Sequence, residues 1–560
     1  MRRLLPAAVL VVSVSVACGQ ATSEHFAGPS GGGASSSGGT SSGSGGGGSS
    51  GGGGTFGDGG LAGDASAPVS DPTTCAEAAA AHSYIGCDYW PTTLSNFVWS
   101  IFDFAVVVAN PQQAPATVTL TGPAGYSQQV TVAPGALTKV YLPWDDALKG
   151  PQWDTCTDIP SFAASIASPK GAYHLVSSVP VTVYQFNALE YAPQGGPSGK
   201  SWSSCPGDQS CQGSPYGCYS FSNDASLLLP TTALTGDYRL MGVMSSTGQG
   251  SYFAVTGTED GTTVTVKLSK TASVAAGGGL AATQGPGTIT FTLNAADVVE
   301  IAGPGASTSE DLSGSLLTAD KPVQVIAGHP CLAIPQDDPN ATCDHVEQSV
   351  FPAETLGKHY VVVAPTGPKN APVGHRVRVY GNVDGTQLTY SPSRPSGCPA
   401  TIDAGAVVDC GVVSASFEVE GDHEFDVGMI QQSADVVDPG AAEDASEGDP
   451  SLSFATPVEQ FRSDYIFLAP GDYDMSFADV VVAPGTTLTL DGAPVTATPL
   501  QVGSSFSVLR VPLSVGTTGG THVMAGSQPF GIQVIGYGQY TSYQYPGGLD
   551  LRSIAPAPAQ

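Results

Sequence analysis

The chain has 560 residues, with 18 Lys plus Arg against 48 Asp plus Glu, a formal net charge of -30. This surplus of carboxylates repels phosphate backbones and anionic lipid surfaces, which argues against nucleic acid as a partner. Only 12% of the residues are charged, while Gly (72) and Pro (44) abound, so short strands joined by turns are favoured over long helices. The chain is too long for a single hydrophobic core, and its length predicts about three or four domains.

The N-terminus has the features of an export signal. Met1–Arg3 is cationic, Leu4–Val16 is apolar, and small residues end at Ala17, directly before Cys18. Residues 1–17 are therefore predicted to be a signal peptide. This start resembles that of a bacterial lipoprotein. The resemblance implies that Cys18 is diacylated and becomes the mature N-terminus, with ordinary signal-peptidase cleavage as the alternative.

A flexible tether is expected after Cys18. Residues 18–70 contain an almost unbroken Gly/Ser stretch, Ser30–Gly60, which is typical of a disordered linker. No segment after Val16 is apolar over enough residues to cross a bilayer, so membrane attachment is expected through the lipid alone. Gly19 lacks the aspartate that favours inner-membrane retention, and we expect an outer-membrane or cell-surface location.

The cysteine pattern indicates an oxidising compartment. Of eleven cysteines, ten remain once Cys18 is assigned to the lipid. Three couples share a separation of twelve residues and predict local bridges: Cys75 with Cys87, Cys331 with Cys343, and Cys398 with Cys410. Four more are expected to form two bridges, and the sequence does not determine which of them pair: Cys156, Cys205, Cys211 and Cys218. Free or metal-bound thiols are the alternative, which the absence of Cys-x-x-Cys weakens.

An internal repeat organises the body. Each copy has a proline, an apolar residue four positions later and a tyrosine eight positions later: Pro230, Leu234, Tyr238; Pro352, Leu356, Tyr360; Pro457, Phe461, Tyr465. A glycine followed by alternating apolar residues comes next in each copy, at Gly261, Gly385 and Gly485. This period of two predicts β-hairpins. A weaker first copy is identified at Pro91 and Trp99.

We expect an all-β fold of about four tandem β-sandwich-like units, each closed by a long apolar strand. A radial, propeller-like arrangement is the alternative, although its blades normally need only about 40 to 50 residues. The predicted units are 75–192, 220–333, 334–434 and 451–546. The intervening segments are predicted to be a Cys-rich loop (193–219), a solvated acidic linker (435–450) and a disordered tail (547–560).

No catalytic motif was found, since Gly-x-Ser-x-Gly is absent from the folded body and His-Glu-x-x-His is absent altogether. The densest polar cluster runs from Gly328 to Cys331 and from Cys343 to Glu347. It could stabilise a bridged loop or hold a metal ion, and we favour the first. No cofactor is expected, with calcium at acidic turns as the alternative (Asp337-Asp338, Asp472 and Asp474). Four late tyrosines could form a contact surface or complete the last strand: Tyr537, Tyr540, Tyr543 and Tyr545.

The same cluster carries a family resemblance. Thr318–Cys331, Ile334-Pro335 and Cys343–Gln348 resemble the N-terminal domain of IgGFc-binding protein, and the similarity extends over about Ser220–Gln544. The resemblance implies an extracellular binding or adhesive module with no catalytic residues. Its motif residues are Gly328, His329, Cys331, Cys343, Asp344, His345 and Glu347.

Together these observations predict a lipid-anchored surface protein in which a row of β-units binds a protein or polysaccharide ligand without catalysis. Two other hypotheses stay open. One is a glycan hydrolase with paired carboxylates, which β-folds can carry without a compact motif. The other is a structural spacer in a surface assembly.

Overall fold

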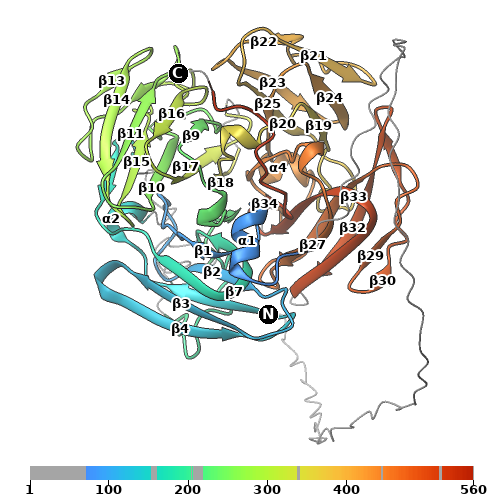
Figure 1. The fold of residues 1–560 in the computed structure, drawn as a ribbon, viewed down its shortest axis with the longest axis horizontal. Coiled ribbons are helices and arrows are strands. Elements are labelled where there is room, and N and C mark those ends of the chain that lie inside the picture. The colour runs from blue at the N-terminus through green and yellow to red at the C-terminus, as the bar shows by residue number, and fades with distance from the viewer. Residues whose placement is uncertain are drawn as a thin grey trace, which may run out of the picture. The chain divides into compact units, whose positions relative to one another are not determined.

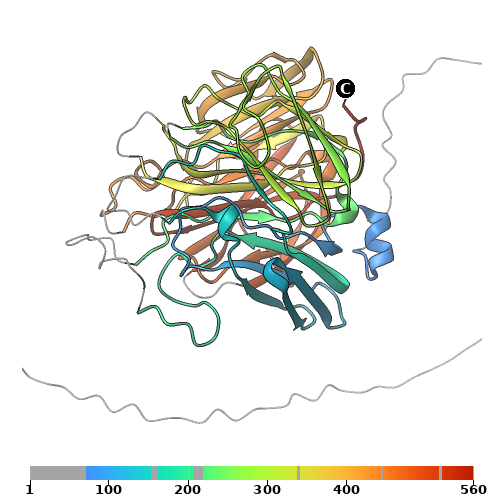
Figure 2. The same ribbon diagram turned by 90° about the vertical axis from the view of Figure 1, so that its left-hand side faces the viewer.

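The computed structural model describes residues 71–152, 160–203, 205, 218–246, 248–336, 341–442, 445–515 and 520–558, all within the compact unit Ser66–Gln560. The signal peptide, Cys18, the Gly/Ser linker, Cys156 and Cys211 lie outside these residues. The described part consists mainly of strands (Figures 1 and 2), as predicted. Its short α-helices are α1 (Cys75–Ala81), α2 (Asp146–Lys149) and α4 (Ala434–Val437). Within the described ranges, no helix combines the length and apolarity needed to cross a membrane.

The first unit is built around the long strand β7. Its main sheet has the order β4-β3-β7-β2-β5, with β1 also paired to β7. The strands are β1 (Gly86–Tyr89), β2 (Phe104–Ala109), β3 (Ala116–Gly122), β4 (Tyr126–Val132), β5 (Leu137–Leu142) and β7 (His174–Phe186). Strand β6 (Ile166–Ser168) leaves this unit and pairs with β15 of the second.

The second unit has two larger sheets, β18-β17-β10-β15-β6 and β14-β11-β16-β9, and a small hairpin β12-β13. Its strands are β9 (Asp237–Arg239), β10 (Tyr252–Gly257), β11 (Thr262–Lys267), β12 (Ser273–Val274), β13 (Thr283–Gln284), β14 (Thr288–Leu293), β15 (Val298–Ala302), β16 (Leu316–Ala319) and β17 (Val323–Ala333). Alternate residues of β11 are buried, as its period-two pattern predicts.

The third unit repeats this plan with sheets β19-β24-β21-β22 and β23-β20-β25-β26. Its strands are β19 (His359–Val362), β20 (His375–Gly381), β21 (Thr386–Ser391), β22 (Thr401–Ile402), β23 (Val407–Val413), β24 (Phe417–Gly421) and β25 (Phe425–Ile430).

The fourth unit is organised by the long strand β33, which pairs with β27, β28, β29 and β34. Its strands are β27 (Arg462–Ala469), β28 (Met475–Val482), β29 (Leu488–Leu490), β30 (Ala493–Pro494), β31 (Leu500–Val502), β32 (Phe506–Val515) and β33 (Gly520–Gly538).

The repeated proline-to-tyrosine frame has a structural explanation. The proline precedes a 3₁₀ turn, and the turns are η2 (Thr231–Ala233), η3 (Ala353–Thr355) and η4 (Val458–Gln460). The tyrosine hydroxyl then donates to a backbone carbonyl at the closing strand. Tyr238 donates to Val323 at 2.7 Å, Tyr360 donates to Phe425 at 2.6 Å, and Tyr465 donates to Phe530. The frame therefore ties the start of each unit to its last long strand.

The first copy of the frame was placed wrongly at Pro91 and Trp99. Tyr89 occupies the tyrosine position, because its hydroxyl donates to the carbonyl of Val181 at 2.6 Å, next to the start of the apolar closing segment. The position eight residues before Tyr89 is an alanine, so the proline that marks the other copies is missing here.

Four inner strands connect the units. β8 (Ala225–Leu227), β18 (Cys343–Ser349), β26 (Leu452–Phe454) and β34 (Thr541–Pro546) pair with β7, β17, β25 and β33, respectively. Each inner strand also contacts two others, in the closed cycle β8, β18, β26, β34. The sheets are those expected of β-sandwich-like repeats, and the units share a centre instead of forming a row, as in the radial alternative.

The two ends of the described chain complete this arrangement. Leu551 donates its amide to the carbonyl of His82 at 2.9 Å, and Tyr84 donates to Leu549 at 3.3 Å. Leu549 and Leu551 are buried. Residues 547–551 are therefore packed against the N-terminal segment, and the amides of Ile554 and Ala555 donate to Glu354, contrary to the prediction of a disordered tail.

The segment 435–450 also differs from the expected solvated linker. Asp438 and Asp449 are buried. Asp438 forms an ion pair with Lys369 at 2.8 Å, and Asp449 accepts a hydrogen bond from Thr342 at 2.7 Å. Composition indicated an exposed acidic run, but these specific donors compensate the burial of its carboxylates.

Candidate functional site

The family-motif residues lie in the interior. His329, Asp344, His345 and Glu347 have no exposed surface. Gly328 faces the ring of Tyr252, since a Cβ atom at this position would lie 2.5 Å from it. The motif therefore occupies adjacent positions on β17 and β18 where no external ligand reaches it.

His345 and Glu347 form a buried polar pair. His345 Nδ1 donates to the carbonyl of Ser95 at 3.1 Å, and Nε2 lies 3.4 Å from Glu347 Oε2. That oxygen also accepts from Asn187 at 2.6 Å. Burial lowers the pKa of His345 to about 3 and raises the pKa of Glu347 well above its usual value. A neutral imidazole and a neutral carboxyl fit this environment.

His329 also has a structural environment. Its Nδ1 accepts the amide of Cys331 at 3.1 Å, and its Nε2 lies 3.2 Å from the Ser246 hydroxyl. Burial, followed by the nearby His345, lowers the pKa of His329 to about 3. These contacts support the stabilising role over the metal-binding one.

Asp224 connects all four inner strands. Its Oδ2 accepts the amides of Glu347 in β18 and Leu452 in β26, both at 3.0 Å. Its Oδ1 accepts the amides of Ala225 at 2.8 Å and Gln544 in β34 at 3.4 Å. Burial raises the pKa of Asp224, while these hydrogen bonds oppose the shift. The sequence does not reveal this role of Asp224, because its partners in the other three inner strands are 123 to 320 positions away.

The disulfides follow the predicted spacing. The structure joins Cys75 to Cys87, Cys331 to Cys343, and Cys398 to Cys410. It also joins Cys205 to Cys218, one of the pairings that the sequence left open. The Cys331–Cys343 bridge connects β17 to β18 within the family motif.

The late tyrosines belong to the core. Tyr537, Tyr543 and Tyr545 have no exposed surface, and Tyr540 is 8% exposed. They therefore complete β33 and its surroundings and do not form a contact surface, because their rings and hydroxyls pack against residues of their own unit and of other units.

The acidic turn considered for calcium has other partners. Asp472 pairs with Lys139, and Asp474 accepts a hydrogen bond from Tyr191. Asp337 and Asp338 lie outside the described residues. The contacts of Asp472 and Asp474 give no joint site that would favour calcium.

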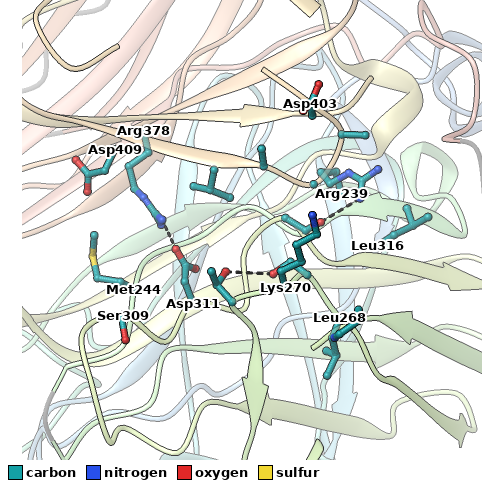
Figure 3. A pocket seen from close by; sticks show the side chains of 18 of the residues that line it. Arg239, Met244, Leu268, Lys270, Ser309, Asp311, Leu316, Arg378, Asp403 and Asp409 are labelled. Atoms are coloured by element: carbon teal, nitrogen blue, oxygen red, sulfur yellow. Dashed lines mark hydrogen bonds and ion pairs between the residues drawn. The ribbon is translucent and has the colours of Figure 1, made fainter. Parts of the chain in front are cut away.

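A cavity of about 790 Å³ lies between the sheets β14-β11-β16-β9 and β23-β20-β25-β26 (Figure 3). Five of the chain's 18 Lys and Arg residues line it: Arg239, Lys267, Lys270, Arg376 and Arg378. Cations are scarce in this acidic chain, so their concentration in one cavity indicates a binding site for an anionic group.

Two of these cations have carboxylate partners. Arg376 pairs with Asp409 at 2.7 Å, and Arg378 reaches Asp311 (Figure 3). Arg378 is nearly fully buried, and its Nε has no hydrogen-bond partner among the described residues. A buried guanidinium with a free donor is suited to a further acceptor.

The other three cations make no ion pair, although Asp384 acts on Arg239 at longer range and Asp403 lines the same cavity. Arg239 donates to the carbonyl of Gly314 at 3.0 Å, and Lys267 and Lys270 are exposed. Within the described residues, none of the three is within ion-pair distance of a carboxylate. Five cations and three carboxylates (Asp311, Asp403 and Asp409) line the cavity, so it has surplus positive charge in a protein of net charge -30.

The floor of the cavity depends on two glycines. Gly314 and Gly405 have φ angles of +82° and +73°, and a Cβ on Gly314 would lie 2.1 Å from the carbonyl oxygen of Gly405. Only glycine permits this backbone contact between the second and third units. The sequence did not reveal the cavity because its cations come from β9, β11, the turn after β11 and β20, which belong to two different units.

Comparison with known proteins identifies the central region. The profile of a family described as IgGFc binding protein matches residues 224–536, more than half of the chain. A human protein described as IgGFc-binding protein is 26% identical over 252 residues, covering 44% of this chain and 4% of that protein. This chain therefore corresponds to a small part of that relative. No solved structure matches it.

Proposed function

Because this chain belongs to the IgGFc-binding protein family, we propose that it is a non-catalytic binding protein whose basic cavity receives an acidic group of an extracellular ligand. The matched region, 224–536, includes all five cations of the cavity. The observation that carries this proposal is the group Arg239, Lys267 and Lys270, which face the cavity without carboxylate partners.

Local charge governs recognition here despite the acidic composition. At physiological ionic strength the screening length is about 8 Å, so the distant surface carboxylates contribute little within the cavity. A carboxylate that enters the site meets the unpaired cations. We expect the ligand to be an extracellular protein with an acidic segment. An acidic polysaccharide is the second candidate, because it presents the same charges.

The family name describes immunoglobulin binding by the human relative, of which this chain spans 4%. The present proposal rests on the cavity and does not require immunoglobulin as the ligand. The protein is further proposed to be exported, anchored through a lipid on Cys18, and held away from the outer membrane by its Gly/Ser linker. Labelling with a palmitate analogue tests this, since a Cys18→Ala protein that remains equally labelled and membrane-bound would refute the anchor.

The ligand proposal is tested by pull-down of secreted proteins and envelope polysaccharides with the mature chain. A Lys267→Gln, Lys270→Gln double variant should lose most of the captured ligand. The matched control is Lys170→Gln, Lys358→Gln, which removes the same charge from exposed positions outside the cavity. Binding that falls equally in both variants would indicate a general charge effect, and unchanged binding in the cavity variant would exclude this site.

A further inference from the structure

Three metal-ligating side chains lie together on the third unit, away from the basic cavity. His359 is in β19, and Glu418 and Glu420 are in the adjacent strand β24. His359 lies opposite Glu420 in the antiparallel register. Glu418 precedes Glu420 by two residues, so both carboxylates project from the same face of the sheet as His359.

The distances among these groups are unusual for an ordinary ion pair. His359 Nε2 lies 3.4 Å from Glu418 Oε2 and 3.6 Å from Glu420 Oε1. A direct charge-assisted hydrogen bond would bring nitrogen and oxygen to about 2.7–2.9 Å. His359 Nε2 is instead a buried nitrogen without a hydrogen-bond partner among the described residues.

The same distances fit a shared metal ion. Zinc binds histidine nitrogen and carboxylate oxygen at about 2.0–2.2 Å in tetrahedral geometry, which places neighbouring ligand atoms about 3.3–3.6 Å apart. All three candidate ligand atoms lie within 4.8 Å of one another. The unpartnered nitrogen and both carboxylates would therefore gain a common partner.

We propose that His359, Glu418 and Glu420 bind a divalent transition-metal ion, with Zn²⁺ as the best fit. The imidazole disfavours Ca²⁺ and Mg²⁺, which prefer oxygen ligands alone. Three protein ligands leave the fourth tetrahedral position for water or for a group from a partner.

The surroundings suit a metal site. Glu420 is 62% exposed and gives the ion a route from solvent, whereas the Glu418 side chain is 4% exposed. The other oxygen of Glu418, Oε1, accepts the amide of Ser505 at 2.8 Å, which orients the carboxylate. The ring of Phe506 packs edge-on against His359 at 5.5 Å. Such outer contacts fix the ligands and raise affinity.

Metal binding would also strengthen a contact between units. Ser505 precedes β32 of the fourth unit, while the proposed ligands belong to the third. An ion that fixes Glu418 also fixes the acceptor of the Ser505 amide. The site does not depend on the basic cavity, so either proposal can fail without the other.

The test measures Zn²⁺ binding to the full chain after treatment with EDTA, by calorimetry and by competition with a chromophoric chelator. Co²⁺ provides a second probe, because tetrahedral coordination gives a strong visible absorption. The variants are Glu420→Gln, at an exposed position, and His359→Asn. The control is His423→Asn, which removes an exposed histidine on the loop after β24.

We expect both site variants to weaken the tight site at least about tenfold, as even outer-shell changes cost about 10- to 100-fold. His423→Asn should bind like the wild type. Thermal unfolding in EDTA establishes that each variant is folded. Zn²⁺ should raise the melting temperature of the wild type but not of Glu420→Gln. Equal binding by all four proteins, or no tetrahedral Co²⁺ spectrum in the wild type, would overturn the proposal.

Discussion

Replacing Asp224 with asparagine tests the connection among the four inner strands. The carboxylate accepts four backbone amides, two at each oxygen. Asparagine offers one oxygen and one NH₂ group. In either orientation, two backbone amides lose their acceptor and face a donor. An unsatisfied buried group costs about 1–3 kcal/mol, so we expect Asp224→Asn to lower the free energy of unfolding by about 2–6 kcal/mol.

The assay is urea-induced unfolding of the full chain with its disulfides intact, followed by circular dichroism. Asp320→Asn is the matched control, because exposed Asp320 accepts a single amide, from Thr263 at 2.8 Å. The control should stay within about 0.5 kcal/mol of the wild type, as is usual for surface changes. Burial raises the pKa of Asp224, so a protonated side chain is the rival state. A protonated carboxyl, like asparagine, has one oxygen that accepts and one group that donates. A variant as stable as the wild type would therefore refute an ionised Asp224 that accepts all four amides.

Three further changes test separate parts of the fold, each by the free energy of unfolding. Burial raises the pKa of Glu300 to about 8, so the native state holds an extra proton and this residue should lower the free energy of unfolding by about 1.4 kcal/mol per unit as pH rises from about 4.5 to 8. Glu300→Gln should reduce the slope of the wild type by this amount in unfolding curves at pH 5 to 8; an unchanged slope would contradict the assignment. Tyr360→Phe removes the hydroxyl that donates to Phe425, and should cost about 1–3 kcal/mol in urea unfolding, with no loss contradicting the role of the frame. Replacing Cys398 and Cys410 with alanine opens a twelve-residue loop and should cost about 3 kcal/mol in thermal and urea unfolding; full stability would show that the bridge is dispensable.

Local patterns made much of the fold predictable. The glycine-led hairpins at Gly261 and Gly385 lead into β11 and β21, because alternation of apolar residues is determined within a few positions. The bridges with a spacing of twelve were equally local. The proline-to-tyrosine frame was recognisable as a repeat. Its role became clear only from the structure, which shows where the closing strand lies.

Long-range contacts were not predictable from one sequence. His359 and Glu420 are 61 positions apart, and only the register of β19 and β24 brings them together. The acidic segment before β26 indicated solvent exposure, yet Asp449 is buried because Thr342, from another unit, supplies its hydrogen-bond donor. The composition of a segment indicates whether it tends to be exposed to solvent. It does not show which distant hydrogen-bond donor allows a carboxylate to be buried.

The positions of the buried acids follow from the short inner strands. Within the described residues, each of β8, β18, β26 and β34 pairs with a single strand, so one edge has amides without sheet partners. Acidic residues lie within three positions of the starts of three of them, at Asp224, Asp344 and Asp449. Thr541, which begins β34, has no carboxylate and donates instead to Asp344 at 2.7 Å.

These acids therefore accept hydrogen bonds from polar groups of the inner strands that have no partner in a sheet. Their hydrogen bonds, like those of the family motif, are made to other parts of the same chain. A ligand would have to replace contacts that hold the units together. We expect a ligand to bind instead at groups that have no partner within the chain and lie near contacts between units. These groups are the unpaired cations around Lys270 and the unpartnered nitrogen of His359.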